Sequence, residues 1–397
     1  MILSRSRLDL LPERLSAWRR ALHRCPEVGL DLPRTTACLQ GELRAMGLEP
    51  VPVGRGFVVD LGPGPRVAWR ADMDALPLQE QTGAPYASEH PGAMHACGHD
   101  AHMAVGLALA WLLADLQPQP AVRIIFQPDE EGLHGAGPLV EAGVLEGVEA
   151  VLGLHVGQLL EGLGPGSFAL RTGIQMAAGD RFWATFKGRG THGAQPHLGR
   201  DPLVAAAAYV GTLQTLVGRA ATPGRLAVAS VGTFLAGTSP NIIPESAALA
   251  GILRTELPGD RSRLVARLEE AARGIAAAHE VELEWTHLAS CPAVRNDPAW
   301  AARARDAVRR VAGPGGLVEM QVPAATSDDI GFYLERVPGV YLFLGTNDPA
   351  RGITEPNHSP RFEVAEDQLW KAVAYGVEML APGSWPDLPG EGRPAGS

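Results

Sequence analysis

Apolar and polar residues fall into short, well-separated runs over the first part of the chain. Apolar positions at helical spacing predict helices over residues 11–23 and 35–46. A longer apolar run predicts a buried helix over residues 101–116, with Asp100 as its N-cap. Apolar runs bounded by turn residues predict strands at 56–61, 66–69, 122–126 and 150–154. Strands that alternate with helices in this way predict an α/β sheet covered by helices.

The order of the elements changes near Gly179. The apolar pattern then predicts strand, helix, strand, strand, helix and strand, at 181–186, 202–217, 225–233, 247–254, 261–279 and 281–288. This order is the split βαβ arrangement of a ferredoxin-like unit. We therefore expect residues 179–291 to form an inserted α+β lid or dimerisation domain.

The α/β pattern resumes after this insertion. A helix is predicted over 300–311, a buried strand over 340–344 and a last helix over 366–380. The catalytic domain, with a central mixed sheet flanked by helices, is thus expected to comprise residues 1–178 and 292–381. The Pro/Gly-rich segment 382–397 is expected to be a disordered tail.

Length, charge and cysteine usage exclude several classes of protein. A chain of 397 residues is long enough for two domains. Its net charge of −10 and its lack of a basic cluster argue against a nucleic-acid partner. The most apolar window, 105–116, is shorter than a membrane span, and no apolar stretch for a signal peptide follows the N-terminus. Four cysteines without paired spacing predict a reduced, cytoplasmic protein.

Potential metal ligands follow the predicted strands. Asp72 and Asp74 end one strand, Glu130 and Glu131 follow another, and His155 ends a third. In open α/β sheets, sites form outside the carboxyl ends of strands. The stretch 94–102, with its thiol and three imidazoles, precedes the buried helix and offers further ligands of the types that zinc prefers.

Five side chains are the leading candidates for ligands, and they are too many for one catalytic tetrahedral ion that also holds water. They suit two metal ions, which together can activate water and polarise a carbonyl. The candidates are Cys97, His99, Glu131, His155 and His358. Read alone, the cysteine could be a buried apolar residue, and residues 129–131 could be a solvated acidic turn.

The neighbouring polar residues receive supporting roles. Glu130, beside a metal-binding carboxylate, is a suitable general base. His95 and His102 are interpreted as supporting residues. The segment 188–193 also matches a dinucleotide-binding fingerprint, but no acidic residue ends a second strand about 20 residues later, so we reject that interpretation.

Seven motifs together resemble the M20 family of metal-dependent amidohydrolases, in order along residues 15–380. The similar branch contains hippurate hydrolases, N-acyl-amino-acid hydrolases and indoleacetyl-amino-acid hydrolases. The motifs are RADMDALP (70–77), HACGHD (95–100), FQPDEEG (126–132), GLH (153–155), THGAQPH (191–197), NIIP (241–244) and HSPRF (358–362).

The resemblance implies the five ligands named above, binding two divalent ions, zinc or manganese and possibly cobalt or nickel. It also implies that Glu130 is the general base and that Asp74 orients a ligand. His192 would reach the active site of a partner subunit and stabilise the oxyanion, with help from Asn241. Arg254 would bind the substrate carboxylate. A homodimer, possibly a homotetramer, is expected.

The sequence departs from the family pattern at three places. Asp129 stands where alanine is common, and Leu133-His134 replaces a glycine pair. Asp328 replaces glutamate in a Ser-Glu-Asp motif. These changes affect the expected substrate preference more than catalysis, because no predicted ligand is lost. His134 is either a pocket residue or a solvated loop histidine.

The resulting hypothesis is hydrolysis of an N-acyl amino acid, such as an acetyl or benzoyl conjugate, to a carboxylate and a free amino acid. One alternative is a dipeptidase or carboxypeptidase on the same scaffold, which would require a free amino group on its substrate. Another is a metal-binding protein without catalytic activity. A complete set of ligands and a base favours the enzyme.

Overall fold

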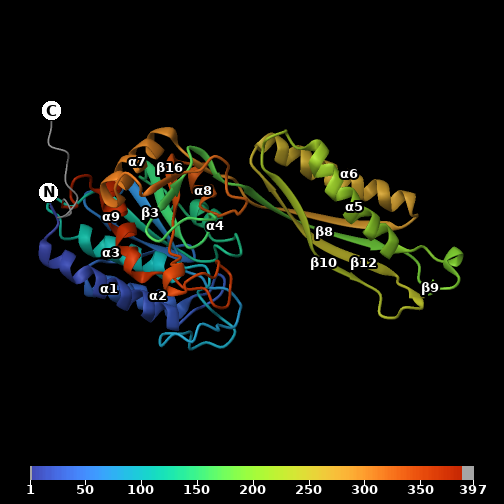
Figure 1. Cartoon of the computed structure of the whole chain (residues 1–397), viewed down its shortest axis with the longest axis horizontal. Coiled ribbons are helices and arrows are strands. Elements are labelled where there is room, and N and C mark those ends of the chain that lie inside the picture. Colours follow the sequence, from blue (N-terminus) through green and yellow to red (C-terminus); the bar gives the residue numbers. More distant parts are fainter. Residues whose placement is uncertain (1, 387–397) are drawn as a thin grey trace. The chain divides into compact units, whose positions relative to one another are not determined.

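The computed structural model describes residues 2–386 of the chain, which divides into two compact units (Figure 1). Unit 2 comprises Ile174–Val294 and Gln321–Gly331, and unit 1 comprises the other described residues. The sequence predicts limits of 179 and 291 for the insertion and does not foresee the second segment. That segment joins unit 2 because Ala324 pairs with Met176 in a β-bridge.

An eight-stranded mixed sheet forms the centre of unit 1, in the order β1-β2-β4-β3-β5-β16-β6-β15. Strands β4, β3, β5 and β16 are parallel neighbours, so their carboxyl ends lie at one edge of the sheet. The outer strands add antiparallel pairs. The bounds are β1 (Val51–Val53), β2 (Gly56–Leu61), β3 (Val67–Asp72), β4 (Val122–Gln127), β5 (Ala150–Val156), β6 (Phe168–Leu170), β15 (Leu317–Glu319) and β16 (Gly339–Leu344).

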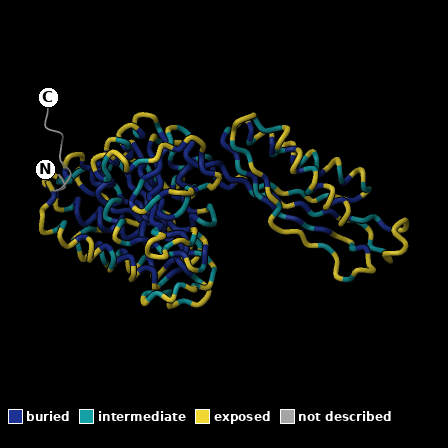
Figure 2. Tube along the Cα trace, in the orientation of Figure 1, coloured by how far each residue is buried: buried dark blue, intermediate teal, exposed yellow. Residues whose placement is uncertain are grey.

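Helix α3 (His99–Leu113) is the central helix of unit 1 and is buried along its whole length (Figure 2). It packs across β3, β4 and β5, while α1 and α9 pack against it. Its sequence explains this burial, because no charged residue follows Asp100 within the helix. The other helices are α1 (Arg5–Arg24), α2 (Pro33–Ala45), α4 (Ala136–Glu141), α7 (Pro298–Ala312), α8 (Gly331–Leu334) and α9 (Leu369–Leu380), with short turns η2 (Pro349–Arg351) and η3 (Glu366–Gln368).

The start of α3 differs from the sequence prediction. Its N-cap is Gly98, in the left-handed region with φ of 89°, and not Asp100. A side chain at Gly98 would place its Cβ 2.5 Å from Val156 Cγ2, so the turn requires glycine. The prediction of Asp100 as the cap is wrong because its buried carboxylate instead binds Arg19 Nε at 2.6 Å and His23 Nδ1 at 2.7 Å.

Unit 2 contains a four-stranded antiparallel sheet in the order β10-β12-β8-β13, against which α5 and α6 pack. Buried and less buried residues alternate along β12, as expected for a sheet with one covered face. The chain order β8, α5, β10, β12, α6, β13 is the split βαβ arrangement. The bounds are β8 (Ala178–Lys187), α5 (Pro202–Ala220), β10 (Ala227–Ala236), β12 (Ser246–Thr255), α6 (Pro258–Ala278) and β13 (Glu282–Cys291).

Two small sheets complete the description. One pairs β9 (Thr191–His192) with β11 (Ile242–Ile243), and the other pairs β7 (Gly173–Met176) with β14 (Val294–Asn296). The turn η1 (Pro196–Leu198) follows β9.

The expected C-terminal tail begins with residues that pack on unit 1. Ser384 accepts a hydrogen bond from the Leu3 N–H at 2.8 Å, and the Trp385 ring lies 6.4 Å from that of Trp370. Residues 387–397 of the predicted tail lie outside the described residues. Within the described part of the chain, no helix is both long enough and apolar enough to cross a membrane.

Candidate metal centre

The ends of four parallel strands bring the predicted site residues of unit 1 together. Asp72 is the last residue of β3, and Glu130 and Glu131 follow β4. His155 lies near the end of β5, and His358 lies in the loop that follows β16. Neighbouring parallel strands end at the same edge of the sheet, so residues far apart in sequence meet there.

The five predicted ligands form two overlapping groups. The ligand atoms of Cys97, His99 and His155 all lie within 4.8 Å of one another, and so do those of Cys97, Glu131 and His358. Cys97 Sγ lies 3.4 Å from His155 Nε2, and His358 Nε2 lies 3.2 Å from Glu131 Oε1. Cys97 belongs to both groups, which is the arrangement expected when two ions occupy adjacent positions.

The two buried histidines are held in the orientation that metal ligation requires. His99 Nδ1 donates to the carbonyl oxygen of Asp74 at 2.9 Å, and His155 Nδ1 donates to that of Val156 at 2.8 Å. In its neutral form, each ring therefore carries its proton on Nδ1 and presents the lone pair of Nε2 to a metal ion. Among residues 2–386, His99 Nε2 has no hydrogen-bond partner although it is buried. A soft thiolate, imidazoles and a carboxylate fit divalent ions such as zinc.

Asp74 connects two parts of the site. Its carboxylate, 1% exposed, accepts hydrogen bonds from the backbone N–H of Glu130 at 3.0 Å and of Glu131 at 3.1 Å. Its carbonyl oxygen anchors His99, as described above. The turn that it fixes carries both glutamates: Glu131 lies with Cys97 and His358, and Glu130 Oε2 lies 3.9 Å from His99 Nε2. Ligand atoms of His99, Glu130 and Glu131 also lie within 4.8 Å of one another.

His102 and His95 are not arranged as ligands. His102 also lies near Asp72 and His99, but both of its nitrogens are engaged. Its Nδ1 donates to Asp72 Oδ1 at 2.5 Å, and its Nε2 accepts from the Val156 N–H at 2.9 Å. Burial lowers the pKa of His95 to about 3, so this ring stays neutral.

The surroundings favour bound positive charge. Burial by itself would lower the pKa of His99, but Asp72, Asp74 and Glu131 outweigh it and raise the pKa to about 10. Burial and the neighbouring glutamates raise the pKa of the Cys97 thiol well above its usual value. A divalent cation bound by these groups would displace their protons, because thiolate and neutral imidazole are the ligating forms.

Asn357 is a site residue that the sequence analysis did not identify. Its Nδ2 donates to the carbonyl oxygens of Cys97 at 3.1 Å and Val156 at 3.2 Å, so it ties three segments together. The His358 N–H also donates to the Ala96 carbonyl oxygen at 2.7 Å, and His358 has a positive φ of 69°. The position of Asn357 next to a predicted ligand was the available signal in the sequence. Its role could not be predicted from that position, because its contacts are with residues distant in sequence.

The residues that depart from the family pattern form a strained turn. Asp129 and Leu133 both have positive φ, at 53° and 61°. Glycine is favoured at such positions, and Asp tolerates them better than Leu does. The His134 side chain is 56% exposed, with Nδ1 3.5 Å from Asp129 Oδ2, and belongs to neither ligand group.

Three predicted site residues lie in unit 2. His192 pairs with Ile242 across the small sheet, and the Gly193 N–H donates to the Asn241 carbonyl oxygen at 2.8 Å. His192 helps to line a cavity of about 670 Å³.

Arg254, on β12, is more than half buried, and burial lowers its pKa. In the part of the chain that the structure describes, its guanidinium forms no ion pair. Asp328 caps a local turn, its Oδ1 accepting from the Ile330 N–H at 2.8 Å.

Comparison with known proteins bears on the family of this chain. Residues 68–381 match Peptidase family M20/M25/M40. The N-acetyl-L-cysteine deacetylase of Bacillus subtilis (strain 168) is 35% identical, over 94% of this chain and 88% of that protein. IAA-amino acid hydrolase ILR1-like 5 of Arabidopsis thaliana is 38% identical, over 91% of this chain and 84% of that protein.

A solved structure shows the same fold. The crystal structure of the YXEP protein of Bacillus subtilis, described as a dinuclear metal-binding peptidase from the M20 family, aligns with a TM-score of 0.78 and 34% identity. The alignment covers 94% of this chain and 98% of that chain. Together with the two overlapping ligand groups, this likeness supports a site for two metal ions. The chain therefore belongs to Peptidase family M20/M25/M40.

Proposed function

We propose that this protein is a metal-dependent hydrolase that cleaves the amide bond of N-acyl amino acids to a carboxylate and a free amino acid. The observation that supports the proposal is the meeting of five candidate ligand side chains and one further carboxylate at a single edge of the sheet. The relatives named above, a deacetylase of N-acetyl-L-cysteine and a hydrolase of an acyl amino acid, support this substrate class.

Five side chains would hold the two divalent ions. When bound, the ions would supply the Lewis acidity that activates water and polarises the amide carbonyl. Zinc suits the thiolate and imidazole donors, and the carboxylate also admits manganese, with cobalt and nickel as further possibilities. The five residues are Cys97, His99, Glu131, His155 and His358.

Glu130 is proposed as the general base. It is 5% exposed, and its backbone N–H is fixed by Asp74 at 3.0 Å. Its carboxylate lies near His99 without belonging to either group that shares Cys97. Glu130 can therefore take the proton of the attacking water and return it to the nitrogen that leaves.

His192 and Asn241 are proposed to stabilise the oxyanion in the active site of a partner subunit. His192 Nδ1 accepts a hydrogen bond from the Ala194 N–H at 3.1 Å, so the ring carries its proton on Nε2. The exposed Nε2–H is then a donor of the kind that an oxyanion requires. Asn241 directly precedes β11, whose Ile242 pairs with His192, and this neighbourhood supports a shared role.

Arg254 is proposed to bind the substrate carboxylate. A guanidinium that is more than half buried loses hydration, and an anionic partner normally offsets this loss. Arg254 has no ion pair among residues 2–386, which leaves it available for the carboxylate of an acyl amino acid.

A homodimer, alone or as half of a homotetramer, is proposed from the edge of the unit 2 sheet. Strand β10 is an edge strand, and Phe234 and Leu235 on it are 40% and 73% exposed. An edge strand with exposed apolar residues is stabilised when it pairs with another chain. A reduced cytoplasmic environment is proposed because Cys25, Cys38, Cys97 and Cys291 are all free thiols.

Substitution of Glu130 by glutamine tests the proposal. Glu130→Gln should bind metal as the wild type does but lose a factor of about 10²–10⁴ in kcat, because only the proton acceptor is removed. Turnover would be measured with acetyl, benzoyl and indoleacetyl amino acids as substrates, after each metal in turn is added back to the metal-free protein. Glu141→Gln, an exposed glutamate of α4, is the matched control.

The same assays separate the alternatives. Faster cleavage of dipeptides with a free amino group than of acyl amino acids would indicate a peptidase. Bound metal without turnover of any substrate would indicate a protein that lacks catalysis. A kcat of Glu130→Gln close to that of the wild type would remove Glu130 from the mechanism.

A further inference from the structure

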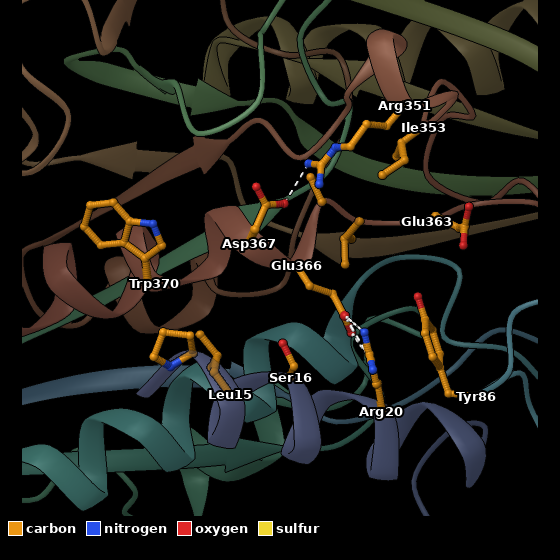
Figure 3. Close-up of a pocket in the computed structure, with 13 residues that line it drawn as sticks. Leu15, Ser16, Arg20, Tyr86, Arg351, Ile353, Glu363, Glu366, Asp367 and Trp370 are labelled. Atoms are coloured by element: carbon orange, nitrogen blue, oxygen red, sulfur yellow. Dashed lines mark hydrogen bonds and ion pairs between the residues drawn. The ribbon is translucent and has the colours of Figure 1, made fainter. Parts of the chain in front are cut away.

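Unit 1 contains a cavity that is distinct from the candidate metal centre. It measures about 400 Å³, within the size range of small-molecule sites. Its walls come from α1, through Leu15 and Arg20, from Tyr86, and from the segment 351–370 (Figure 3). None of the five proposed metal ligands lines it.

Both arginines of this cavity are paired with carboxylates. Arg20 is bound to Glu366 through three N···O contacts, of which the shortest is 2.6 Å. Arg351 uses Nε for Asp348 at 2.5 Å and Nη2 for Asp367 at 2.6 Å.

Two groups remain able to bind a ligand. A guanidinium has five N–H donors, so Arg351 keeps unused donors on Nη1. Glu363 makes no hydrogen bond or ion pair within the described residues. Figure 3 shows Arg351 and Glu363 on the same side of the cavity, with Ile353 between them in this view.

The remaining lining is apolar or aromatic. Leu15, Ile353 and Val364 contribute aliphatic surface, and Trp370 and Tyr86 contribute aromatic rings. Figure 3 shows Trp370 and Tyr86 at opposite ends of the cavity. Such a mixture suits a small molecule with an apolar body and a few polar groups.

We propose that this cavity binds a free α-amino acid with an apolar side chain, its ammonium group on Glu363 and its carboxylate on Arg351. A simple anion would meet three carboxylates, those of Glu363, Glu366 and Asp367. A simple cation would meet two guanidinium groups. A zwitterion satisfies both signs of charge, and its side chain covers the apolar lining.

The cavity is connected to the candidate metal centre by buried charges. Glu366 accepts a hydrogen bond from Arg19 Nη1 at 3.2 Å, and Arg19 Nε donates to Asp100 at 2.6 Å. Arg19 and Asp100 are both fully buried, so the chain of charges is not screened by solvent. Asp100 directly follows the proposed ligand His99 at the start of α3.

The backbone gives a second connection. The segment 358–367 begins with His358 and includes Glu363, Glu366 and Asp367 of the cavity wall. A ligand on Glu363 would therefore contact the segment that carries a proposed metal ligand. A free amino acid is the product of the proposed hydrolysis, so an amino acid bound in this cavity would act as a feedback inhibitor. This inhibitory role rests on the proposed function, whereas the binding of the amino acid does not.

Hydrogen exchange with L-leucine as the probe tests the binding site on the metal-loaded protein. L-leucine should slow amide exchange in residues 351–370. Glu363→Gln should weaken this effect by about tenfold or more, since one charge-assisted hydrogen bond is lost. Glu13→Gln, an exposed glutamate on α1 that does not line the cavity, should respond as the wild type does.

Two analogues of leucine test the zwitterion. Leucinamide lacks the carboxylate and 4-methylpentanoate lacks the ammonium group, so each should protect residues 351–370 at least about tenfold less well. Arg351→Gln, on an exposed side chain, is a second variant if Glu363→Gln fails to fold. Equal protection in Glu363→Gln, or no protection of residues 351–370 in the wild type, would overturn the proposal.

An activity assay separates this inference from the proposed function. L-leucine should inhibit the wild type more strongly than Glu363→Gln if the cavity is coupled to the metal centre. Leucine that protects residues 351–370 in a protein without hydrolase activity would support the site and reject the function. Active enzyme whose segment 351–370 is unprotected would support the function and reject the site.

Discussion

Substitution of Asp74 by asparagine is the sharpest test of how the candidate metal centre is organised. The carboxylate of Asp74 accepts two backbone hydrogen bonds, from Glu130 and Glu131, at 3.0 and 3.1 Å. Asparagine has one oxygen acceptor, and its NH₂ group would face the other backbone N–H. The turn that carries the proposed base and one proposed ligand would then lose half of its anchoring.

The expected loss follows from these contacts. A hydrogen bond to a charged acceptor contributes about 1.5–3 kcal/mol. Water cannot replace the lost acceptor for the backbone N–H, because Asp74 is only 1% exposed. We therefore expect the metal-free Asp74→Asn protein to lose about 2–3 kcal/mol in free energy of unfolding. Metal affinity should fall by a factor of about 10–100, as for other residues that orient metal ligands.

Urea denaturation of the metal-free protein and calorimetric titration with zinc measure these two effects separately. Asp60→Asn is a matched control, because Asp60 binds Arg123 through both oxygens at 2.7 Å but its side chain is 36% exposed. That surface pair should contribute only about 0–1 kcal/mol. Unchanged metal affinity and stability in Asp74→Asn would refute the role assigned to this carboxylate.

Three further predictions test other parts of the structure. Leu133→Gly should raise the free energy of unfolding by about 1 kcal/mol in urea denaturation, because Leu133 has a φ of 61°; a loss of stability would contradict this. Burial alone would lower the pKa of His23, but Asp100 and Glu80 raise it above 6.5. The charged His23 ring therefore stabilises the fold fully below pH 6.5, and this contribution is lost as pH rises through the raised pKa. The stability advantage of wild type over His23→Gln should thus shrink as pH rises above about 6.5. Gly179→Ala should raise KM about tenfold for carboxylate substrates but not for their amides, because the added Cβ would lie 2.9 Å from Arg254 Nη1; an equal effect on both would count against the carboxylate role.

The sequence predicted the elements around the metal centre because their signals are local. The strand predicted at residues 56–61 coincides with β2, and the strands predicted at 122–126 and 150–154 lie within β4 and β5. Turn residues and apolar runs determine such elements over a few positions. The same reasoning failed at Asp100, because a capping signal does not reveal that Arg19 and His23 compete for the carboxylate.

The sequence by itself determined the kinds of ligand available and the strand ends that would carry them. Only the tertiary structure decided which ring nitrogens are free, since His102 is engaged at both nitrogens while His99 is anchored at Nδ1 alone. It also decided that Asp74 holds the turn of both glutamates and that a separate cavity lies beside α1. The physical reason is that residue type and periodicity act over a few residues, whereas a site depends on hydrogen bonds and packing between segments far apart in sequence.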